Sequence, residues 1–194
     1  MDDDPHMRHR LLILTLAALL AGCSKPAPKT TIQQYMEDEV NPAGEYLFHS
    51  VEQVSDAKGV RFKTPETPDE WKAVSERLAV LQNTPDVITA RGIKAAPPGF
   101  KSEHPGIESP PAWIQQTIDS HRADFAKRAQ RLRTAADKAA EAAQAHDGRA
   151  LYRSLDGIDK ACESCHLHYF YPGDKRAWVA AKEDGMSDRP GVFD

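Results

Sequence analysis

The sequence is poor in cysteine, in aromatic residues and in excess basic charge. Its 194 residues include three cysteines, and aromatic residues make up 7% of the chain. A small, odd number of cysteines excludes a framework of paired disulfides. The formal net charge of −4 offers no basic surface typical of nucleic-acid-binding proteins, so we expect no nucleic-acid partner. The length fits a single domain with a substantial core.

The first 22 residues have the features of a bacterial lipoprotein signal peptide. Two arginines follow Met7, and the apolar run from Leu11 to Leu20 is too short to span a bilayer. The ending Leu20-Ala21-Gly22-Cys23 resembles a lipobox, which implies lipidation of Cys23 and a polar tether over residues 23–30. We therefore expect a location in the bacterial cell envelope, anchored by lipid and facing the periplasm, with the outer membrane favoured over the inner. The alternative is a plain secretory signal with an incidental cysteine.

Four later stretches carry apolar residues every three or four positions, which predicts four amphipathic helices. They cover about residues 31–56, 67–85, 111–145 and 151–169, and a loop rich in proline and glycine covers 91–111. Pro42 is expected to kink or divide the first helix, and Gly148 to cap the end of the third. Thr67 and Glu70 have the spacing of a capping box. No stretch shows convincing strand alternation.

The predicted fold class is therefore all-α. We expect an antiparallel four-helix bundle over residues 31–171, followed by a C-terminal tail over residues 172–194. Charges on the third predicted helix alternate in sign along the chain, which indicates a solvated face.

The other two cysteines belong to the sequence CESCH, residues 162–166, near the end of the fourth predicted helix. Helical spacing brings Cys162, Cys165 and His166 to one face, and this face continues the apolar stripe of the helix. The spacing C-x-x-C-H is that of c-type haem attachment. In such a site the two sulfurs form thioethers with the haem vinyl groups and the imidazole binds the iron. The motif predicts one covalent haem c near the C-terminal end of the fourth helix.

Three other sites compete for the same cysteines. A redox-active C-x-x-C pair prefers a helix N-terminus, where the helix dipole lowers a thiol pKa, whereas this pair lies near a helix end. A structural zinc site needs a fourth ligand, and the sequence offers no second cysteine pair. A disulfide between positions three apart closes a very short loop and would stabilise little. Haem attachment is the favoured interpretation, with the redox pair and zinc as alternatives.

With this motif at the end of the fourth helix, the chain resembles the class II c-type cytochromes, the cytochrome c' family. The resemblance covers about residues 31–171 and rests on the stretches CESCHLHYFYP and YMEDEVNPAGEYLFHSV. It implies Cys162 and Cys165 as the thioether residues, His166 as the proximal iron ligand, and Tyr169 as the aromatic residue three places later. Phe170 stands where many members carry a basic residue, which is a departure from the gas-binding branch.

The family divides by what binds the sixth position of the iron, and low-spin members use a methionine of the first helix. The place of Met36, six residues ahead of NPAGEYLF, implies this role. The alternative is that Met36 only fills the core, as most methionines on apolar helical faces do. His49 and His121 are the competing ligands, but for each the favoured interpretation is a partly exposed or hydrogen-bonded histidine. His168 follows the motif too closely to reach the opposite haem face, and His104 and His146 are expected to be solvated.

These features favour an electron-transfer protein over an enzyme, because no nucleophile triad or paired-carboxylate site is present in the sequence. The expected partners are redox proteins of the periplasm or membrane, the membrane itself through the lipid anchor, and, since bundles of this family often dimerise, a second copy of the chain. A second hypothesis is a five-coordinate haem protein that binds a diatomic gas such as nitric oxide. A third is a haem-free lipoprotein whose bundle serves as a scaffold.

Overall fold

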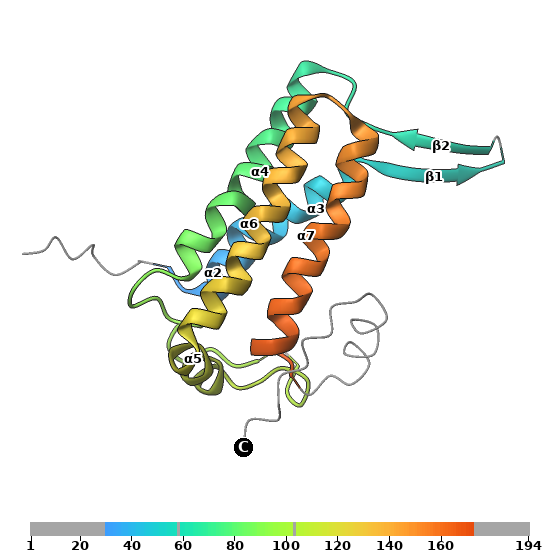
Figure 1. Cartoon of the computed structure of the whole chain (residues 1–194). Coiled ribbons are helices and arrows are strands. Elements are labelled where there is room, and N and C mark those ends of the chain that lie inside the picture. The colour runs from blue at the N-terminus through green and yellow to red at the C-terminus, as the bar shows by residue number, and fades with distance from the viewer. Residues whose placement is uncertain (1–29, 58, 103, 173–194) are drawn as a thin grey trace, which may run out of the picture.

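The computed structural model describes residues 30–57, 59–102 and 104–172, in which four long helices lie side by side (Figure 1). The predicted signal peptide, Cys23, most of the tether and nearly all of the tail lie outside these residues. Within the described ranges, no helix is both long enough and apolar enough to cross a membrane. The predicted all-α bundle is confirmed, with one small hairpin added to it.

The first long helix contains a widened turn. It consists of α2 (Ile32–Tyr35), the π-helical turn η2 (Met36–Val40) and α3 (Asn41–Ser50). Pro42 has no backbone N–H and its ring crowds the carbonyl four residues earlier, which opposes a regular turn just before it. The Asn41 N–H donates to the carbonyl of Met36, the pattern of a π turn. The helix thus accommodates Pro42 by widening at Met36 rather than by dividing.

A β-hairpin follows α3, which corrects two expectations from the sequence. The first helix ends at Ser50 rather than near residue 56, and β1 (Glu52–Asp56) pairs antiparallel with β2 (Gly59–Lys63). The hairpin projects away from the bundle (Figure 1). Its Phe62 ring packs edge-on against Tyr152 of the fourth bundle helix, with ring centroids 5.1 Å apart. This contact fixes the base of the hairpin on the bundle.

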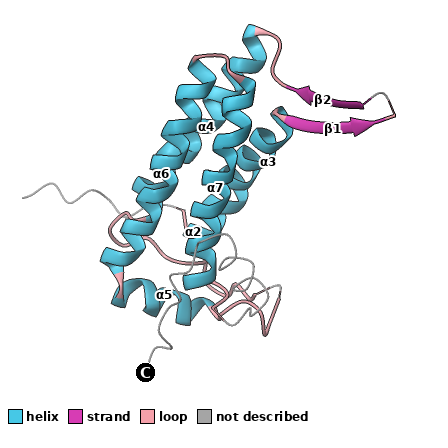
Figure 2. Ribbon diagram, turned by 45° about the vertical axis from the view of Figure 1, so that its right-hand side comes forward, coloured by secondary structure: helices cyan, strands magenta, loops and turns pink. Residues whose placement is uncertain are grey.

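The second bundle helix, α4 (Pro68–Ile88), begins with the predicted capping box. The Glu70 N–H donates to the Thr67 hydroxyl oxygen over 3.2 Å, and the Glu70 carboxylate accepts from the Thr67 N–H over 2.8 Å. The third predicted helix is two helices, α5 (Pro111–Ser120) and α6 (Arg122–Gln144), because His121 leaves helical geometry with φ −126° and ψ 37°. Short α5 lies at one end of the bundle (Figure 2).

The last bundle helix, α7 (Gly148–Tyr169), starts where the sequence predicted a cap for the preceding helix. His146, with φ 51°, takes the left-handed conformation after α6, and the Asp147 carboxylate caps α7 by accepting from the Ala150 N–H over 2.9 Å. Gly148 is the first residue of α7, so its predicted role is wrong. A Cβ at this position would collide with the Thr64 side chain, and this close approach explains the glycine.

Buried apolar side chains form two clusters along the bundle. The larger one lies toward the hairpin and includes Leu47, Leu78, Leu132 and Leu155. The smaller one lies toward α5 and includes Ile32, Ile88, Phe125 and Tyr169. Met36 packs against both clusters, Cys162 against the first and Cys165 against the second. The residues singled out from the sequence therefore lie where the two clusters meet.

Candidate functional site

A cavity of about 400 Å³ lies at the junction of the two clusters. Its size falls within the range of about 300–1,000 Å³ that is typical of ligand sites. Residues from all four long helices line it, and most of the lining is apolar: Ile32, Val40, Leu81, Ile88, Phe125, Leu132 and Ile158. Four further lining residues on α3 are Asn41, Gly44, Glu45 and Phe48, of which Phe48 is 42% exposed. The cavity is therefore an apolar chamber that reaches solvent beside α3.

Helix α7 presents Cys162, Cys165 and His166 to this cavity, as their spacing predicted. All three side chains are half-buried, and the two thiols are free rather than joined in a disulfide. Burial raises the pKa of each thiol to about 12, and the carboxylates of Asp159 and Glu163 act in the same direction on Cys162. Both sulfurs are thus protonated thiols at neutral pH, unlike the activated thiolate that a redox-active C-x-x-C pair requires.

Burial also lowers the pKa of His166, so its imidazole is neutral, the form that binds a metal. The rings of Phe170 and Tyr171 flank this imidazole, each with its centroid 5.7 Å from that of His166. Phe170, the departure from the family pattern noted above, therefore lies against the predicted iron ligand and also lines the cavity. An aromatic side chain here keeps this side of the imidazole apolar where a basic residue would bring charge.

The donor set and the lining fit haem c. Two thiols three residues apart and a neighbouring imidazole supply the groups that hold this cofactor, and the apolar walls suit the porphyrin faces. Within the described ranges, no group of three or more His, Cys, Asp or Glu side chains has the arrangement of a metal site, which gives the zinc alternative no support. When bound, haem would supply an iron that changes oxidation state by one electron.

Met36 and His49 line the same cavity, from the first bundle helix. Met36 is half-buried and is the first residue of the π turn, so the widening at Pro42 helps to set the direction of its side chain. His49 is exposed near the end of α3, where the cavity approaches solvent. Between these two candidates for the sixth ligand, Met36 is the more enclosed.

Four further histidines lie within the described residues, and none of them lines the cavity. His121 is exposed between α5 and α6, and its Nδ1 lies 3.0 Å from the carbonyl oxygen of Thr117. His168 is buried on another face of α7, with Nε2 3.7 Å from the Asp124 carboxylate. His104 is exposed in the loop before α5, and His146 is exposed and stacks on Trp71. None of these four is placed as an iron ligand.

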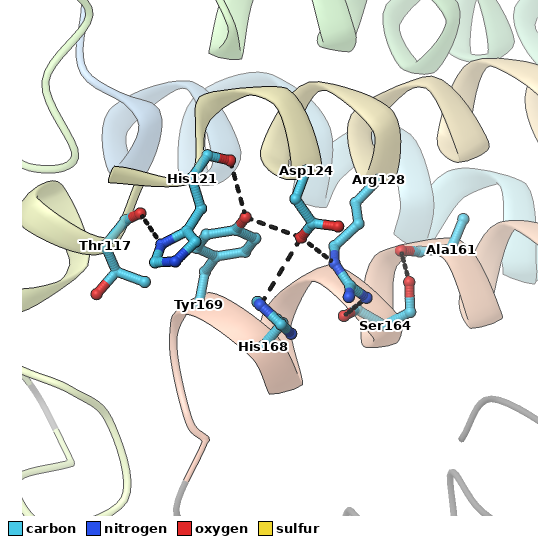
Figure 3. A network of polar contacts seen from close by, with 8 residues as sticks. All are labelled: Thr117, His121, Asp124, Arg128, Ala161, Ser164, His168 and Tyr169. Atoms are coloured by element: carbon cyan, nitrogen blue, oxygen red, sulfur yellow. Dashed lines mark hydrogen bonds and ion pairs between the residues drawn. The ribbon is translucent and has the colours of Figure 1, made fainter. Parts of the chain in front are cut away.

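A buried polar network behind the cavity went unnoticed in the sequence (Figure 3). Arg128 of α6 is 6% exposed and lines the cavity. Its Nε donates to the Asp124 carboxylate over 2.8 Å, and its Nη1 donates to the Ser164 carbonyl over 3.3 Å. The Tyr169 hydroxyl donates to the same carboxylate over 3.0 Å. The network therefore ties α6 to Ser164 and Tyr169, the residues that bracket His166 on α7.

Electrostatics favour an ionised Asp124 in this network. Partial burial works to raise its pKa, but hydrogen bonds from Arg128 and Tyr169 and the charge of Arg128 outweigh this and hold the pKa below its ordinary value. Asp124 and Arg128 lie four residues apart on one helix, so the sequence itself indicates that they can pair. The sequence does not indicate that Arg128 is buried, because the Ser164 carbonyl and the Tyr169 hydroxyl that complete the network come from α7.

Replacing Asp124 with asparagine should destabilise the haem-loaded protein by about 1–3 kcal/mol. The cost is below the range for breaking a fully buried ion pair because the Asp124 side chain is 40% exposed. The matched control is Asp156→Asn on α7, whose carboxylate pairs with Lys160 over 3.1 Å with both side chains exposed, and which should change stability by less than about 0.5 kcal/mol. Urea unfolding followed by helical circular dichroism and by haem absorbance measures both. Equal effects of the two substitutions would contradict the structural role of the network.

Comparison with known proteins identifies one family. Residues 91–169 match the family model described as cytochrome C'. A search of curated proteins gave no match. Among solved structures, a cytochrome c' from Rubrivivax gelatinosus matches with 18% sequence identity and a TM-score of 0.39, covering 72% of this chain and 88% of that one.

The match to this family bears on three predictions. Cytochromes c' carry covalently attached haem c, so the predicted cofactor is confirmed. The family consists generally of haem proteins without enzymatic activity, and its members are typically periplasmic, which agrees with the predicted cell envelope. The matched segment ends at Tyr169 and contains Cys162, Cys165 and His166, but not Met36.

Proposed function

We propose that this chain, whose residues 91–169 match the cytochrome c' family model, is a monohaem electron carrier. In this proposal Cys162 and Cys165 hold the haem, His166 and Met36 are the axial ligands, and Cys23 carries the lipid that anchors the protein at the periplasmic side of a membrane. The observation that carries the proposal is that both axial candidates and both thiols line one apolar cavity.

The residues around this cavity suit electron transfer. An iron held on both sides by fixed ligands changes little in geometry when its charge changes, and a thioether opposite an imidazole favours the ferrous state. Helix packing holds His166 through the network of Asp124 and Arg128, and the π turn holds Met36. When haem is bound, the apolar walls would limit the access of water to it. The side beside Glu45, Phe48 and His49 is where an electron can enter or leave through the cofactor edge.

The second candidate function is binding of a diatomic gas by a five-coordinate haem. Two observations favour it: the family often binds gases, and the cavity lining is apolar. In this case Met36 would be a packing residue beside an open iron position. The distinction rests on one bond, between the Met36 sulfur and the iron.

Spectroscopy of the oxidised and reduced protein separates the two functions. The electron carrier should show a low-spin, six-coordinate haem in both oxidation states, a reversible one-electron reduction, and slow or no reaction with carbon monoxide. A resting high-spin spectrum with rapid and complete binding of carbon monoxide to the ferrous protein would contradict it and would support the gas-binding function instead.

A further inference from the structure

A basic groove runs between α6 and α7, the two helices that lie side by side in Figures 1 and 2. It has a volume of about 550 Å³. Four cationic side chains line it, namely Lys127, Arg131 and Lys138 from α6 and Arg153 from α7. Asp156 is the one acidic residue of the lining. This concentration of positive charge is unexpected in a chain whose formal net charge is −4.

The structure separates the charges of α6 that alternate along its sequence. Outside the groove, charged residues of this helix have polar partners within the protein: Arg122 pairs with Asp119, Arg128 with Asp124 and Arg133 with Asp86, each over 2.8 Å, and Asp137 accepts from Gln82 over 2.8 Å. Lys127, Lys138 and Arg153 make no ion pair or hydrogen bond with any part of the chain that the structure describes. This side of α6 is solvent-exposed, as the sequence predicted, but its charges are mostly of one sign rather than mixed.

Asp156, the acid beside Lys127, Lys138 and Arg153, does not pair with any of these three cations. The Asp156 carboxylate is engaged by Lys160 over 3.1 Å, so this acid brings a further cation with it. Like charges on adjacent helix turns repel one another, and this repulsion is relieved when an anion lies between them. Lys127, Lys138 and Arg153 therefore have no opposite charge paired with them in the part of the chain that the structure describes.

The dimensions of the groove select an extended anion. Lys127, Arg131, Thr134 and Lys138 form one stripe of α6, and the helical rise of about 1.5 Å per residue puts the ends of this stripe about 16 Å apart. The small residues Ala135 and Gly157 lie among the lining. A single phosphate or one lipid headgroup could reach only part of such a row. A row of carboxylates on a protein surface can meet all of it.

The groove also lies close to the haem cavity. Leu132 lines the cavity and its neighbour Arg131 lines the groove, while on α7 Ile158 lines the cavity and its neighbour Gly157 lines the groove. Only the packed pair of helices separates the two. A protein that sits in the groove is therefore held one helix layer from the cofactor.

We propose that this groove is the docking surface for an acidic protein partner, which binds it through a row of carboxylates. The role of this partner in electron exchange with the haem rests on the function proposed above. The binding of acidic chains to the groove is independent of that function. Complementary charge of this kind raises association rates by about 10- to 1,000-fold at low ionic strength and loses its effect as salt is added.

The test uses the full-length, haem-loaded protein in neutral detergent and a fluorescently labelled deca-glutamate peptide as the acidic probe. Fluorescence anisotropy at low salt should show binding that weakens steeply as sodium chloride is added. The variant K127E/K138E/R153E should reduce affinity for the peptide at least about tenfold. The matched control R91E/K94E/K101E makes the same change in net charge at exposed positions between α4 and α5, and it should bind the peptide much more tightly than the groove variant does. Haem absorbance verifies that each variant is folded and loaded.

Three outcomes would overturn the proposal. The first is that the protein does not bind the labelled peptide, and the second is that the control and the groove variant lose equal affinity for it. The third is that millimolar inorganic phosphate displaces the labelled peptide as strongly as unlabelled peptide does. Vesicles containing phosphatidylglycerol provide a further test. If the protein does not bind the peptide but prefers anionic over neutral vesicles, and only the groove variant loses this preference, the groove is a membrane-binding surface instead. Peptide binding does not require the iron to change oxidation state, so a failure of the electron-transfer function would be seen separately.

Discussion

Replacing both Cys162 and Cys165 with alanine should give a chain that carries no covalent haem and does not fold stably. Without its cofactor the chamber of about 400 Å³ leaves apolar walls from all four long helices facing water, at about 25 cal/mol per Å² of exposed apolar surface. The net stability of a domain is only about 5–15 kcal/mol, so we expect this loss of apolar burial to remove a large part of it. Haem staining of a denaturing gel measures attachment, and circular dichroism with urea measures the fold.

The matched control for this prediction is Ser164→Ala, between the two cysteines. Ser164 is buried, and its hydroxyl donates to the Ala161 carbonyl within the same helix, whereas Arg128 uses its backbone carbonyl, which the substitution keeps. The control should retain covalent haem and its helical content. A double cysteine variant that still holds haem covalently, or one that is colourless but as stable as the parent, would show that the cavity is not built around haem c.

Replacing Met36 with alanine should convert the haem from a low-spin to a high-spin spectrum in nearly all molecules. The substitution removes the proposed sulfur ligand and leaves water or an open position on the iron. Loss of a thioether opposite an imidazole also lowers the reduction potential, since axial ligands set this potential over about 0.8 V. The ferrous variant should then bind carbon monoxide rapidly. Optical spectra, electron paramagnetic resonance and a redox titration measure these changes.

His49→Ala is the matched control for Met36, because His49 lines the same cavity from the same long helix. It should leave the spin state and the axial ligands unchanged. If His49→Ala produces the high-spin spectrum and Met36→Ala does not, the sixth ligand is the histidine. If neither does, the haem is five-coordinate or has another ligand, and the gas-binding function gains support.

The helices could be predicted because their signals are local. The stripe of Trp71, Val74, Leu78 and Leu81 is buried on α4 as its spacing indicates, and the capping box at Thr67 stands as predicted. The hairpin could not be predicted in the same way. Its strands are short and largely exposed, so no buried face imposes the strict alternation that marks a strand, and its anchoring contact to Tyr152 joins segments far apart in the sequence.

The break at His121 could not be predicted for a different reason, because here the helical pattern continues where the helix does not. Apolar residues continue with helical spacing from Ile118 through Phe125, and both are buried, so the pattern gives no sign of an interruption. Periodicity records which residues are buried, but it does not record a change in direction of the chain between two helices that share a core.

Part of the candidate site could be predicted from local spacing, and part depends on the packing of helices. Cys162, Cys165 and His166 lie within five residues on one helix, so helical geometry alone brings them together. Met36 joins them only through the packing of the first helix against the last, and the sequence could propose it only by resemblance. Arg128 and its partners lie outside what spacing can show, because burial of a charge depends on groups from two helices.

Mass spectrometry of a tryptic digest of the exported protein is the most direct test of covalent haem attachment at Cys162 and Cys165. Cleavage after Lys160 and Lys175 releases one peptide with both cysteines of the motif. This peptide should carry the added mass of one haem and remain coloured after extraction with acidified acetone. Recovery of the same peptide with two free thiols or a disulfide, from protein that is colourless or loses its pigment to the solvent, would contradict the account.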